Sequence, residues 1–407
     1  MAVIRVRKLF GRFDYEFDMG DMSKEGIIIL SGPNGFGKTV MLEAINAISK
    51  SDLTFFLTLK FESFEVNRIE IEEKLKIEKT ENGLRINNIE LSNETIRLSS
   101  KGIFKREKIL SRYAEFFEEQ KRPSLPLKEE LSETLKQMSQ IFGEIQYIEQ
   151  QRLINLEGED RTVSRRGERR YNKRLLEVNS ISERLENQIR NLNSKYSLLS
   201  NELDRTFLKR LFELEDGIDE EVFNEKIEKV KRKIRKLNDS GISKMGSLDV
   251  TRFKKEDARA LKIYFEDFDK KYQVYEKMIE QIELYKAIVN KHFLFKHLEI
   301  ADEQYLKVVD EDTGEKIRLN CLSSGEQEIL VLYYKLLFEI PEKTIVLIDE
   351  PEISLHIAWQ RMFIQDLKKI VALKNIFVVV ATHSVQIVSG NRHIQYDLGE
   401  LYKNGLN

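Results

Sequence analysis

The sequence predicts an α/β protein with a mixed or parallel core sheet, an antiparallel β layer and an inserted antiparallel helical arm. A short, isoleucine-rich run at residues 26–30 precedes the segment Gly-Pro-Asn-Gly-Phe-Gly-Lys-Thr, which spans Gly32 to Thr39. Two later apolar runs, at residues 344–348 and 376–381, have the length and composition of strands that are buried on both faces. These features indicate the core sheet. The arm is indicated by residues from about 161 to 295, which are highly charged and carry apolar side chains at alternating spacings of three and four.

The predicted antiparallel layer comes from the N-terminal part of the chain. Apolar and charged residues alternate at 2–7 and 13–17, which is the pattern of half-buried strands. Further strands are expected at 61–79 and 84–91, joined by a hairpin turn at Glu81-Asn82-Gly83. After this layer we expect helices at 104–121 and 128–142 and a short strand at 144–148.

Two apolar seams define the predicted arm. Each repeats at coiled-coil spacing, so that two paired helices would extend roughly 50–60 Å at 1.5 Å per residue. A compact helical bundle satisfies the same seams. The seam residues are Val178, Ile181, Leu185, Ile189, Leu192, Tyr196, Leu199 and Leu203, and then Leu261, Phe265, Phe268, Tyr272, Tyr275, Ile279, Ile282, Tyr285 and Val289, with a shorter third seam at 218–237.

Behind the arm, the sequence returns to a β-rich body. Residues 305–309 and 316–319 flank Asp312-Thr313-Gly314, which is a hairpin signal. Helices are expected at 328–338 and at about 359–370.

Composition excludes several classes of protein. The 67 Lys and Arg residues nearly balance 69 Asp and Glu residues, so the net charge of −2 gives no global attraction to nucleic acid or membrane. Cys321 is the only cysteine, which rules out an intrachain disulfide and favours a reducing, cytoplasmic location. The sequence has no signal-peptide pattern and no apolar run near the roughly 20 residues that a membrane span needs, so we expect no membrane partner.

The segment from Gly32 to Thr39 matches the phosphate-binding pattern G-x-x-x-x-G-K-[ST] in full. Glycines allow backbone N–H groups to surround phosphates, and the helix that follows points its positive end at them. Lys38 is expected to reach the β- and γ-phosphates, and the Thr39 hydroxyl to ligate Mg²⁺. The sequence therefore predicts a nucleotide and Mg²⁺ site formed by Gly32, Pro33, Asn34, Gly35, Phe36, Gly37, Lys38 and Thr39.

Two acids follow the apolar run at 344–348. At the C-terminal end of a core strand, Asp349 can hold Mg²⁺ through water, and Glu350 can orient or deprotonate the attacking water. A strand that merely ends in acidic residues is common. The prediction therefore depends on the joint occurrence of these acids with the phosphate-binding loop.

Leu322 to Gln327 resembles the signature motif Leu-Ser-Gly-Gly of ABC-type ATPases, with Ser324 in place of the first glycine. Glu326 follows, as in the chromosome-maintenance and DNA-repair branch of that family. Serine, glycine and a helix N-terminus offer a hydroxyl, N–H donors and a positive helix end to a phosphate, although an ordinary helix cap has the same composition. The resemblance implies that Ser323, Ser324, Gly325 and Glu326 contribute to ATP binding.

The same resemblance assigns a glutamine and a histidine. The family's Q-loop glutamine, which reaches Mg²⁺ and the attacking water, is either Gln150 or Gln151. The switch histidine, which contacts the γ-phosphate, matches His383 in the segment Thr382-His383-Ser384 after the run at 376–381. We therefore expect Glu350, His383 and Gln150 or Gln151 to serve catalysis, and Thr39, Asp349 and Gln150 to hold Mg²⁺.

The chain is thus identified by resemblance as an ABC-type, SMC-like or OLD-like member of the AAA-family ATPases. The motifs assign residues 1–155 and 300–407 to two halves of one ATPase head and residues 156–299 to the inserted arm. Glu350-Pro351-Glu352, followed by Leu355-His356 and a tryptophan, resembles the bacterial branch that includes the OLD-type nucleases and the ATPase subunits of the Septu and PARIS phage-defence systems. OLD nucleases carry a Toprim nuclease domain after the ATPase. The sequence ends soon after His383, so we expect no nuclease activity of the chain itself.

The resemblance implies an ATP-hydrolysing switch. Two subunits would enclose ATP head to tail, as a homodimer or a higher oligomer built from such dimers, and the arm would signal to a separate effector, expected to be a nuclease, in anti-phage defence. The alternative is a DNA-maintenance ATPase that binds DNA directly. Basic arm segments at 161–174 and 228–236 suit a nucleic-acid backbone, an acidic protein surface or solvent equally. A transporter motor fits least, because such motors carry a compact helical subdomain.

Overall fold

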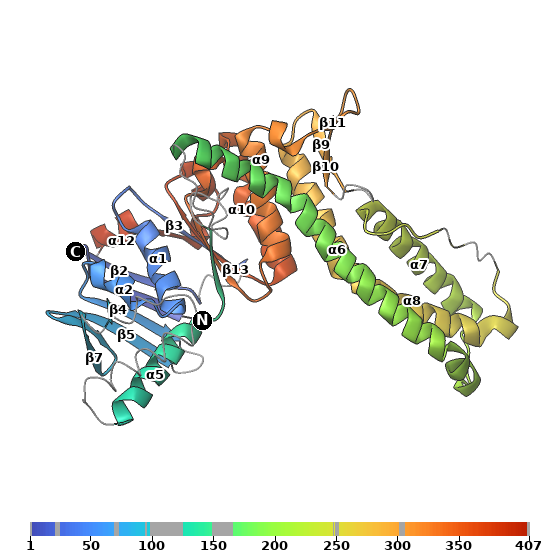
Figure 1. Ribbon diagram of the computed structural model, residues 1–407, viewed down its shortest axis with the longest axis horizontal. Helices are drawn as coiled ribbons and strands as arrows, with labels where there is room; N and C mark the ends of the chain where they lie inside the picture. The colour runs from blue at the N-terminus through green and yellow to red at the C-terminus, as the bar shows by residue number, and fades with distance from the viewer. Residues whose placement is uncertain are drawn as a thin grey trace. The chain divides into compact units, whose positions relative to one another are not determined.

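The computed structural model describes residues 2–20, 25–68, 73–93, 96–97, 125–148, 166–246, 248, 252–300 and 306–404, and the chain divides into two compact units. Unit 1 comprises Met1–Gln151 and Ile340–Asn407, and unit 2 comprises Arg152–Glu339. The predicted α/β class is confirmed, because the chain contains a parallel sheet, antiparallel sheets and long helices (Figure 1). The residues expected to form the signature motif fall in unit 2, together with the long helices.

Five of the described strands form the core sheet of unit 1, in the order β14-β3-β13-β12-β8, and every pairing is parallel. Their carboxyl ends therefore share one edge of the sheet. Alternate side chains such as Ile28 and Val379 belong to the same buried core as helix α1 (Lys38–Ser49) and the antiparallel sheet. The strands are β3 (Ile27–Ser31), β8 (Ile145–Ile148), β12 (Ile345–Asp349), β13 (Phe377–Thr382) and β14 (Gln395–Asp397).

Six further strands form the predicted antiparallel layer of unit 1, in the order β2-β1-β4-β5-β6-β7. The expected strand at 84–91 is in fact two strands, because the chain turns at Asn87, whose φ is 51°. Asparagine tolerates this left-handed conformation, so the turn carries a sequence signal that alternation alone misses. The strands are β1 (Ala2–Leu9), β2 (Phe13–Asp18), β4 (Ser63–Arg68), β5 (Glu73–Thr80), β6 (Gly83–Ile86) and β7 (Ile89–Ser92).

The remaining helices of unit 1 are short, apart from two. The expected helix at 128–142 is present as α5, whereas the one expected at 104–121 lies outside the described residues. The helices are α2 (Leu53–Thr58), α5 (Leu125–Gln140), α10 (Ile357–Lys374), α11 (Val385–Val388) and α12 (Leu398–Asn404), with 3₁₀ turns at Pro351–Ser354 and Arg392–Ile394.

Unit 2 is built on two long antiparallel helices that run side by side (Figure 1). Helix α6 has 48 residues and α8 has 35, which correspond to lengths of about 70 and 50 Å. The predicted seams lie between them: Tyr196 stacks on Tyr275 with ring centroids 5.3 Å apart, and Arg210 forms a bidentate ion pair with Asp267 at 2.6 and 2.7 Å. The helices are α6 (Arg166–Glu213), α7 (Glu220–Ser240), α8 (Ala258–His292) and α9 (Ser324–Tyr334). No helix in the described parts of the chain is long and apolar enough to cross a membrane.

A small three-stranded sheet accompanies these helices, in the order β11-β10-β9. The expected hairpin around Asp312 is confirmed by the pairing of β10 with β11, whereas β9 was not predicted. Helix α9 ends in a π-helical turn, Lys335–Glu339, which sequence periodicity does not show. The strands are β9 (Lys296–Glu299), β10 (Lys307–Asp310) and β11 (Lys316–Ile317), and 3₁₀ turns occur at Lys255–Asp257 and Leu319–Cys321.

A buried carboxylate ties α6 to this π-helical turn. The side chain of Glu177 is 1% exposed and contacts Arg184 at 3.0 Å and Lys335 at 3.1 Å. Arg184 also contacts Glu339 and lies over the ring of Tyr334, 5.4 Å from its centroid. One buried acid therefore contacts two half-buried cations, so its removal takes away part of the counter-charge of both.

We expect Glu177→Gln to lower the free energy of unfolding by about 2 kcal/mol, because the half-buried Arg184 and Lys335 then lose their shared counter-charge. The matched control is Glu213→Gln at the end of α6, where the carboxylate is exposed and lies 3.8 Å from Lys209. That change should stay within about 0.5 kcal/mol of the parent. Urea unfolding followed by far-ultraviolet circular dichroism measures both, and equal midpoints for the two variants would contradict the role of Glu177.

Candidate active site

The phosphate-binding segment connects β3 to α1, as the sequence predicts. Gly35 and Gly37 have φ values of 85° and 91°, a left-handed conformation that other residues adopt at a cost. Gly37 directly precedes α1, so the N-terminal end of that helix points into the loop. The Lys38 ammonium group donates to the carbonyl oxygens of Gly32 at 2.9 Å and Pro33 at 3.2 Å. The loop therefore holds a cation at its centre.

An aromatic cluster supports the tip of this loop. The ring of Phe36 lies 5.0 Å from that of Phe13 and 6.2 Å from that of Tyr402, measured between centroids. The Tyr15 hydroxyl donates to the Phe36 carbonyl at 2.9 Å, and burial raises the pKa of this tyrosine, so it remains a donor. Phe36 thus anchors the loop to β2 and α12.

Two of the predicted Mg²⁺ ligands lie together at the carboxyl edge of the core sheet. The Thr39 hydroxyl donates to an Asp349 carboxylate oxygen at 3.1 Å, although the two residues are 310 positions apart in the sequence. Thr39 is the second residue of α1, and Asp349 ends β12 with only 5% of its surface exposed. The parallel sheet brings them together, because β3 and β12 both end at this edge.

Glu350 leaves β12 in a strained conformation. Its φ is 43° and its ψ is 58°, which for a non-glycine residue costs on the order of 1 kcal/mol or more. The backbone N–H of Glu350 donates to the Ala381 carbonyl at 2.8 Å, and Pro351 begins a 3₁₀ turn directly afterwards. The strand end, the neighbouring β13 and the proline fix the direction in which this carboxylate leaves the sheet.

His383 follows β13 and lies beside two acids. Its Nδ1 atom is 3.7 Å from a Glu350 carboxylate oxygen and 3.0 Å from a Glu352 carboxylate oxygen. The backbone N–H of His383 also donates to the Glu352 carboxylate at 2.7 Å. Glu352 is buried and holds both the main chain and the ring of His383. The sequence analysis assigned Glu352 no role, although its position two residues after Glu350 could have indicated one.

A cavity of about 500 Å³ opens beside the loop. Gly32 and Pro33 line one part of it, and His383 and Arg392 line another. Arg392 was not predicted, because it follows a short helix, α11, that has no periodic signal. The cavity places a further cation next to the phosphate-binding loop.

The expected signature residues form the N-terminal end of α9 in unit 2. The Ser323 hydroxyl accepts from the Glu326 N–H at 3.4 Å, and the Glu326 carboxylate accepts from the Ser323 N–H at 2.9 Å, which is a capping box. Burial alone would raise the pKa of Glu326, but hydrogen bonds from Lys296 and Ser323 outweigh it and hold that pKa below its usual value. The capping interpretation is therefore correct for Ser323 and Glu326. It leaves Ser324 exposed at the start of an 11-residue helix.

The predicted Q-loop glutamines and the two basic segments of the arm remain to be located. Gln150 and Gln151 lie outside the described residues, as do residues 161–165 of the first basic segment. In the second basic segment, on α7, lysines are paired with acids: Lys231 with Glu228, Lys233 with Asp269 and Lys236 with Glu283. Pairing lowers the positive potential that this helix face offers to a phosphate backbone.

Comparison with known proteins agrees with this geometry. A model of the AAA ATPase domain family matches residues 10–388, which is most of the chain. The chain belongs to the AAA ATPase domain family. Membership implies ATP binding and ATP hydrolysis, which confirms the predicted ATPase class. No curated protein matches the sequence of this AAA ATPase at a significant level.

Two solved structures are similar to this AAA ATPase over nearly the whole chain. One is the Smc head domain of Pyrococcus furiosus with an extended coiled coil, bound to the C-terminal domain of ScpA, at 13% identity and a TM-score of 0.36. The alignment covers 96% of this chain and 92% of the chain in that Smc structure. The other is an SmcHead bound to the C-winged helix domain of ScpA, at 10% identity and a TM-score of 0.37. Its alignment covers 95% of this chain and 90% of the SmcHead chain.

The residues at the carboxyl edge fit ATP with Mg²⁺. Mg²⁺ prefers oxygen ligands and is commonly held by one or two protein oxygens together with substrate phosphates and water. Thr39 and Asp349 offer such a pair at 3.1 Å, and Lys38 lies in the loop that would receive the phosphates. In the described parts of the chain, no group of three or more His, Cys, Asp or Glu side chains could hold a metal ion without a nucleotide.

Proposed function

We propose that the chain is an Mg²⁺-dependent ATPase whose hydrolysis site lies at the carboxyl edge of β3, β12 and β13. The observation that carries this proposal is the contact between Thr39 and Asp349, which joins the phosphate-binding loop to the acidic strand end. Lys38, Glu350 and His383 come from the same edge of the same sheet. Phosphoryl transfer needs positioning and charge neutralisation more than covalent chemistry, and these residues offer both.

Each residue has a distinct part in this proposal. Bound Mg²⁺ and ATP supply the phosphoanhydride bond and a divalent charge that neutralises its oxygens. Lys38 neutralises the β- and γ-phosphates, and Thr39 with Asp349 holds the metal directly or through water. Glu350 orients a water and accepts its proton, since its carboxylate is fixed by the strained turn. Glu352 positions His383 through its contacts with the ring and the main-chain N–H, and His383 contacts the γ-phosphate.

We further propose that this ATPase acts as a dimeric switch. Two chains enclose ATP head to tail, with the loop of one facing Ser323, Ser324 and Gly325 of the other, as the resemblance to ABC-type ATPases implies. The antiparallel pair of α6 and α8 then carries the nucleotide state to a separate effector protein, as in bacterial phage defence. The paired lysines of α7 favour this role over direct DNA binding, because few of their charges are left for a phosphate backbone.

We expect Glu350→Gln to bind ATP but to hydrolyse it about 10²- to 10⁴-fold more slowly, because the amide cannot accept a proton from water. The ATP-bound dimer should accumulate, and analytical ultracentrifugation with ATP and Mg²⁺ measures it. Glu90→Gln, at an exposed position of β7, is the matched control and should hydrolyse ATP at the parent rate. A parent-like rate for Glu350→Gln would contradict the catalytic role. No ATP-dependent change in mass would contradict the dimer.

A further inference from the structure

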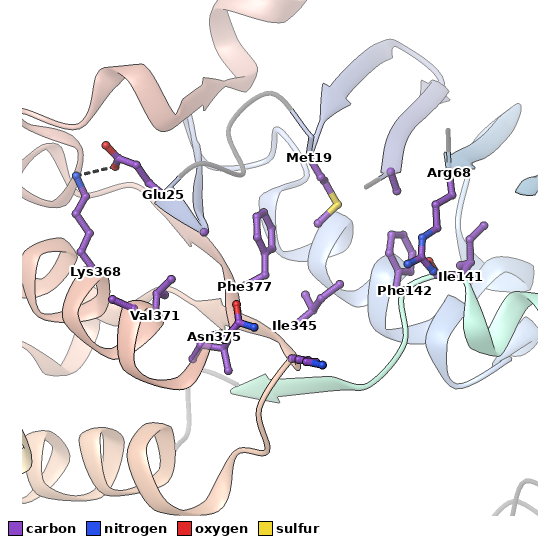
Figure 2. Close-up of a pocket in the computed structure, with 15 residues that line it drawn as sticks. Met19, Glu25, Arg68, Ile141, Phe142, Ile345, Lys368, Val371, Asn375 and Phe377 are labelled. Atoms are coloured by element: carbon purple, nitrogen blue, oxygen red, sulfur yellow. Dashed lines mark hydrogen bonds and ion pairs between the residues drawn. The ribbon is translucent and has the colours of Figure 1, made fainter. Parts of the chain in front are cut away.

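A second cavity lies at the opposite edge of the core sheet in unit 1 (Figure 2). It has a volume of about 680 Å³, which is in the usual range of small-molecule sites. Gly26, Ile345 and Phe377 line it where β3, β12 and β13 begin, whereas the candidate active site lies where these strands end. Five residues of strand span roughly 17 Å, so the two sites are separate.

Two layers and a helix enclose this cavity. Ala2, Met19 and Arg68 come from one end of the antiparallel sheet, where Ala2 pairs with Arg68 and the Met19 N–H donates to the Ala2 carbonyl. Lys368 and Val371 come from α10. In Figure 2 the side chains of Met19 and Phe377 lie in the middle of the view, between Glu25 and Lys368 on one side and Arg68 on the other.

The cavity has an apolar floor. Met19, Ile141, Phe142 and Phe377 are buried, and Ile345 is half-buried. Among the described residues that line it, Asn375 is the only neutral side chain with hydrogen-bonding groups. A ligand rich in hydroxyl or amide groups would leave those groups unpaired here, so the lining favours an apolar body.

The charged side chains of the cavity are mainly basic. Arg68, Lys343 and Lys368 line it, against Glu25 as the only acid among its described lining residues. Glu25 is paired with Lys368 at 2.7 Å. No carboxylate in the described parts of the chain pairs with Arg68 or Lys343, and the Arg68 guanidinium makes only a long contact, 3.4 Å, with the Ile141 carbonyl. Among the described residues, Arg68 and Lys343 are thus the two cations of the cavity without a carboxylate partner.

Two residues that line this cavity have a left-handed backbone conformation. Lys343 and Asn375 both have positive φ, at 60° and 49°, and the Lys343 N–H donates to the Asn375 carbonyl at 3.1 Å. Asparagine adopts this conformation readily at a helix end, but lysine has no such preference. Strained non-glycine residues cluster at ligand sites, and this turn holds Lys343 at the cavity rim.

We propose that this cavity binds a small organic anion with an apolar body, a carboxylate or a phosphate ester, separately from ATP. The apolar part lies on Met19, Phe142 and Phe377, and the anionic group contacts Arg68 and Lys343. Arg68 can bind either a carboxylate or a phosphate with two N–H donors.

The first experiment is isothermal titration of the full chain with two anions and their neutral analogues. Octanoate is compared with 1-octanol, and 1-naphthyl phosphate with 1-naphthol, so that the two arms distinguish a carboxylate from a phosphate ester. At least one anion should saturate a single site and bind about tenfold more tightly than its neutral analogue. Absence of saturable binding by both anions, or equal affinity of anion and analogue in both pairs, would overturn the proposal.

Variants then test where the anion binds. Arg68→Gln should weaken its binding about tenfold, whereas Arg85→Gln, an exposed position of the same sheet, should not. Lys343→Gln should weaken it about threefold, because this side chain is exposed, and Lys369→Gln on the exposed side of α10 is its control.

Two further variants separate this cavity from the ATP site. Ala372→Phe, an exposed change at the cavity rim, should block anion and neutral analogue alike without unfolding the chain. Lys38→Ala should leave the anion affinity unchanged even where ATP binding is lost. Unchanged affinity in both Arg68→Gln and Ala372→Phe, or loss of the anion in Lys38→Ala, would overturn the proposal.

Discussion

Replacing Lys38 by alanine should abolish ATP binding and slow ATP hydrolysis by about 10³-fold or more, the scale typical of losing one cation at a transferring phosphoryl group. Lys38 is the only cation between Gly32 and Thr39. Its ammonium group is held by two backbone carbonyls of the loop, so it is in place before a nucleotide arrives. Without it, the loop itself offers only neutral N–H groups to the β- and γ-phosphates.

The matched control is Lys50→Ala, at the exposed C-terminal end of the same helix. It removes the same charge far from the loop and should bind and hydrolyse ATP as the parent does. Binding is measured with a fluorescent ATP analogue and hydrolysis by phosphate release. Parent-like hydrolysis by Lys38→Ala would show that another site turns over ATP.

Much of the site could be predicted because its parts are short and local. A strand, a glycine-rich turn and a helix are adjacent in sequence, so the position of Lys38 follows from chain order alone. Asp349 was predicted in the same way, since it directly follows an apolar run, whereas His383 was assigned by the resemblance to ABC-type ATPases. Their convergence depends on parallel pairing, which the alternation of strands and helices already implied.

The features that were missed depend on contacts between distant residues or on elements without a periodic pattern. Glu352 reaches His383 only because a 3₁₀ turn folds it back under the neighbouring strand. Phe36 contacts Phe13 and Tyr402 from opposite ends of the chain. Strand β14 has three residues and α11 has four, too few for a hydrophobic period to emerge. The cavity beside Arg68 combines segments from both halves of unit 1, so no local motif announces it.

The signature segment has one role that the structure shows and a second role that we propose. Ser323 and Glu326 close a capping box, which alone explains why they stand three residues apart. The same cap directs the N-terminal end of α9 outward, with Ser324 exposed in its first turn. A test of phosphate binding must therefore alter Ser324 and spare Ser323, whose replacement would cost the helix about 1 kcal/mol.

Ser324→Glu meets this requirement. An acid in the first turn stabilises a helix, so α9 should stay folded, while the added charge should repel the phosphates of an ATP held by a second subunit. We expect this variant to bind ATP but to remain monomeric. The control is Ser194→Glu, which adds the same charge at an exposed position of α6 and should dimerise normally with ATP.

Mixing Ser324→Glu with Lys38→Ala tests most directly whether two subunits share each ATP. Each variant alone should be monomeric with a non-hydrolysable ATP analogue. In a mixed pair, the intact loop of the Ser324→Glu subunit faces the intact α9 of the Lys38→Ala subunit, so one complete site forms. Differently tagged variants should therefore associate only when the analogue is present, and hold about one nucleotide per pair. Failure of the two variants to associate, or normal dimerisation of Ser324→Glu alone, would contradict the shared site.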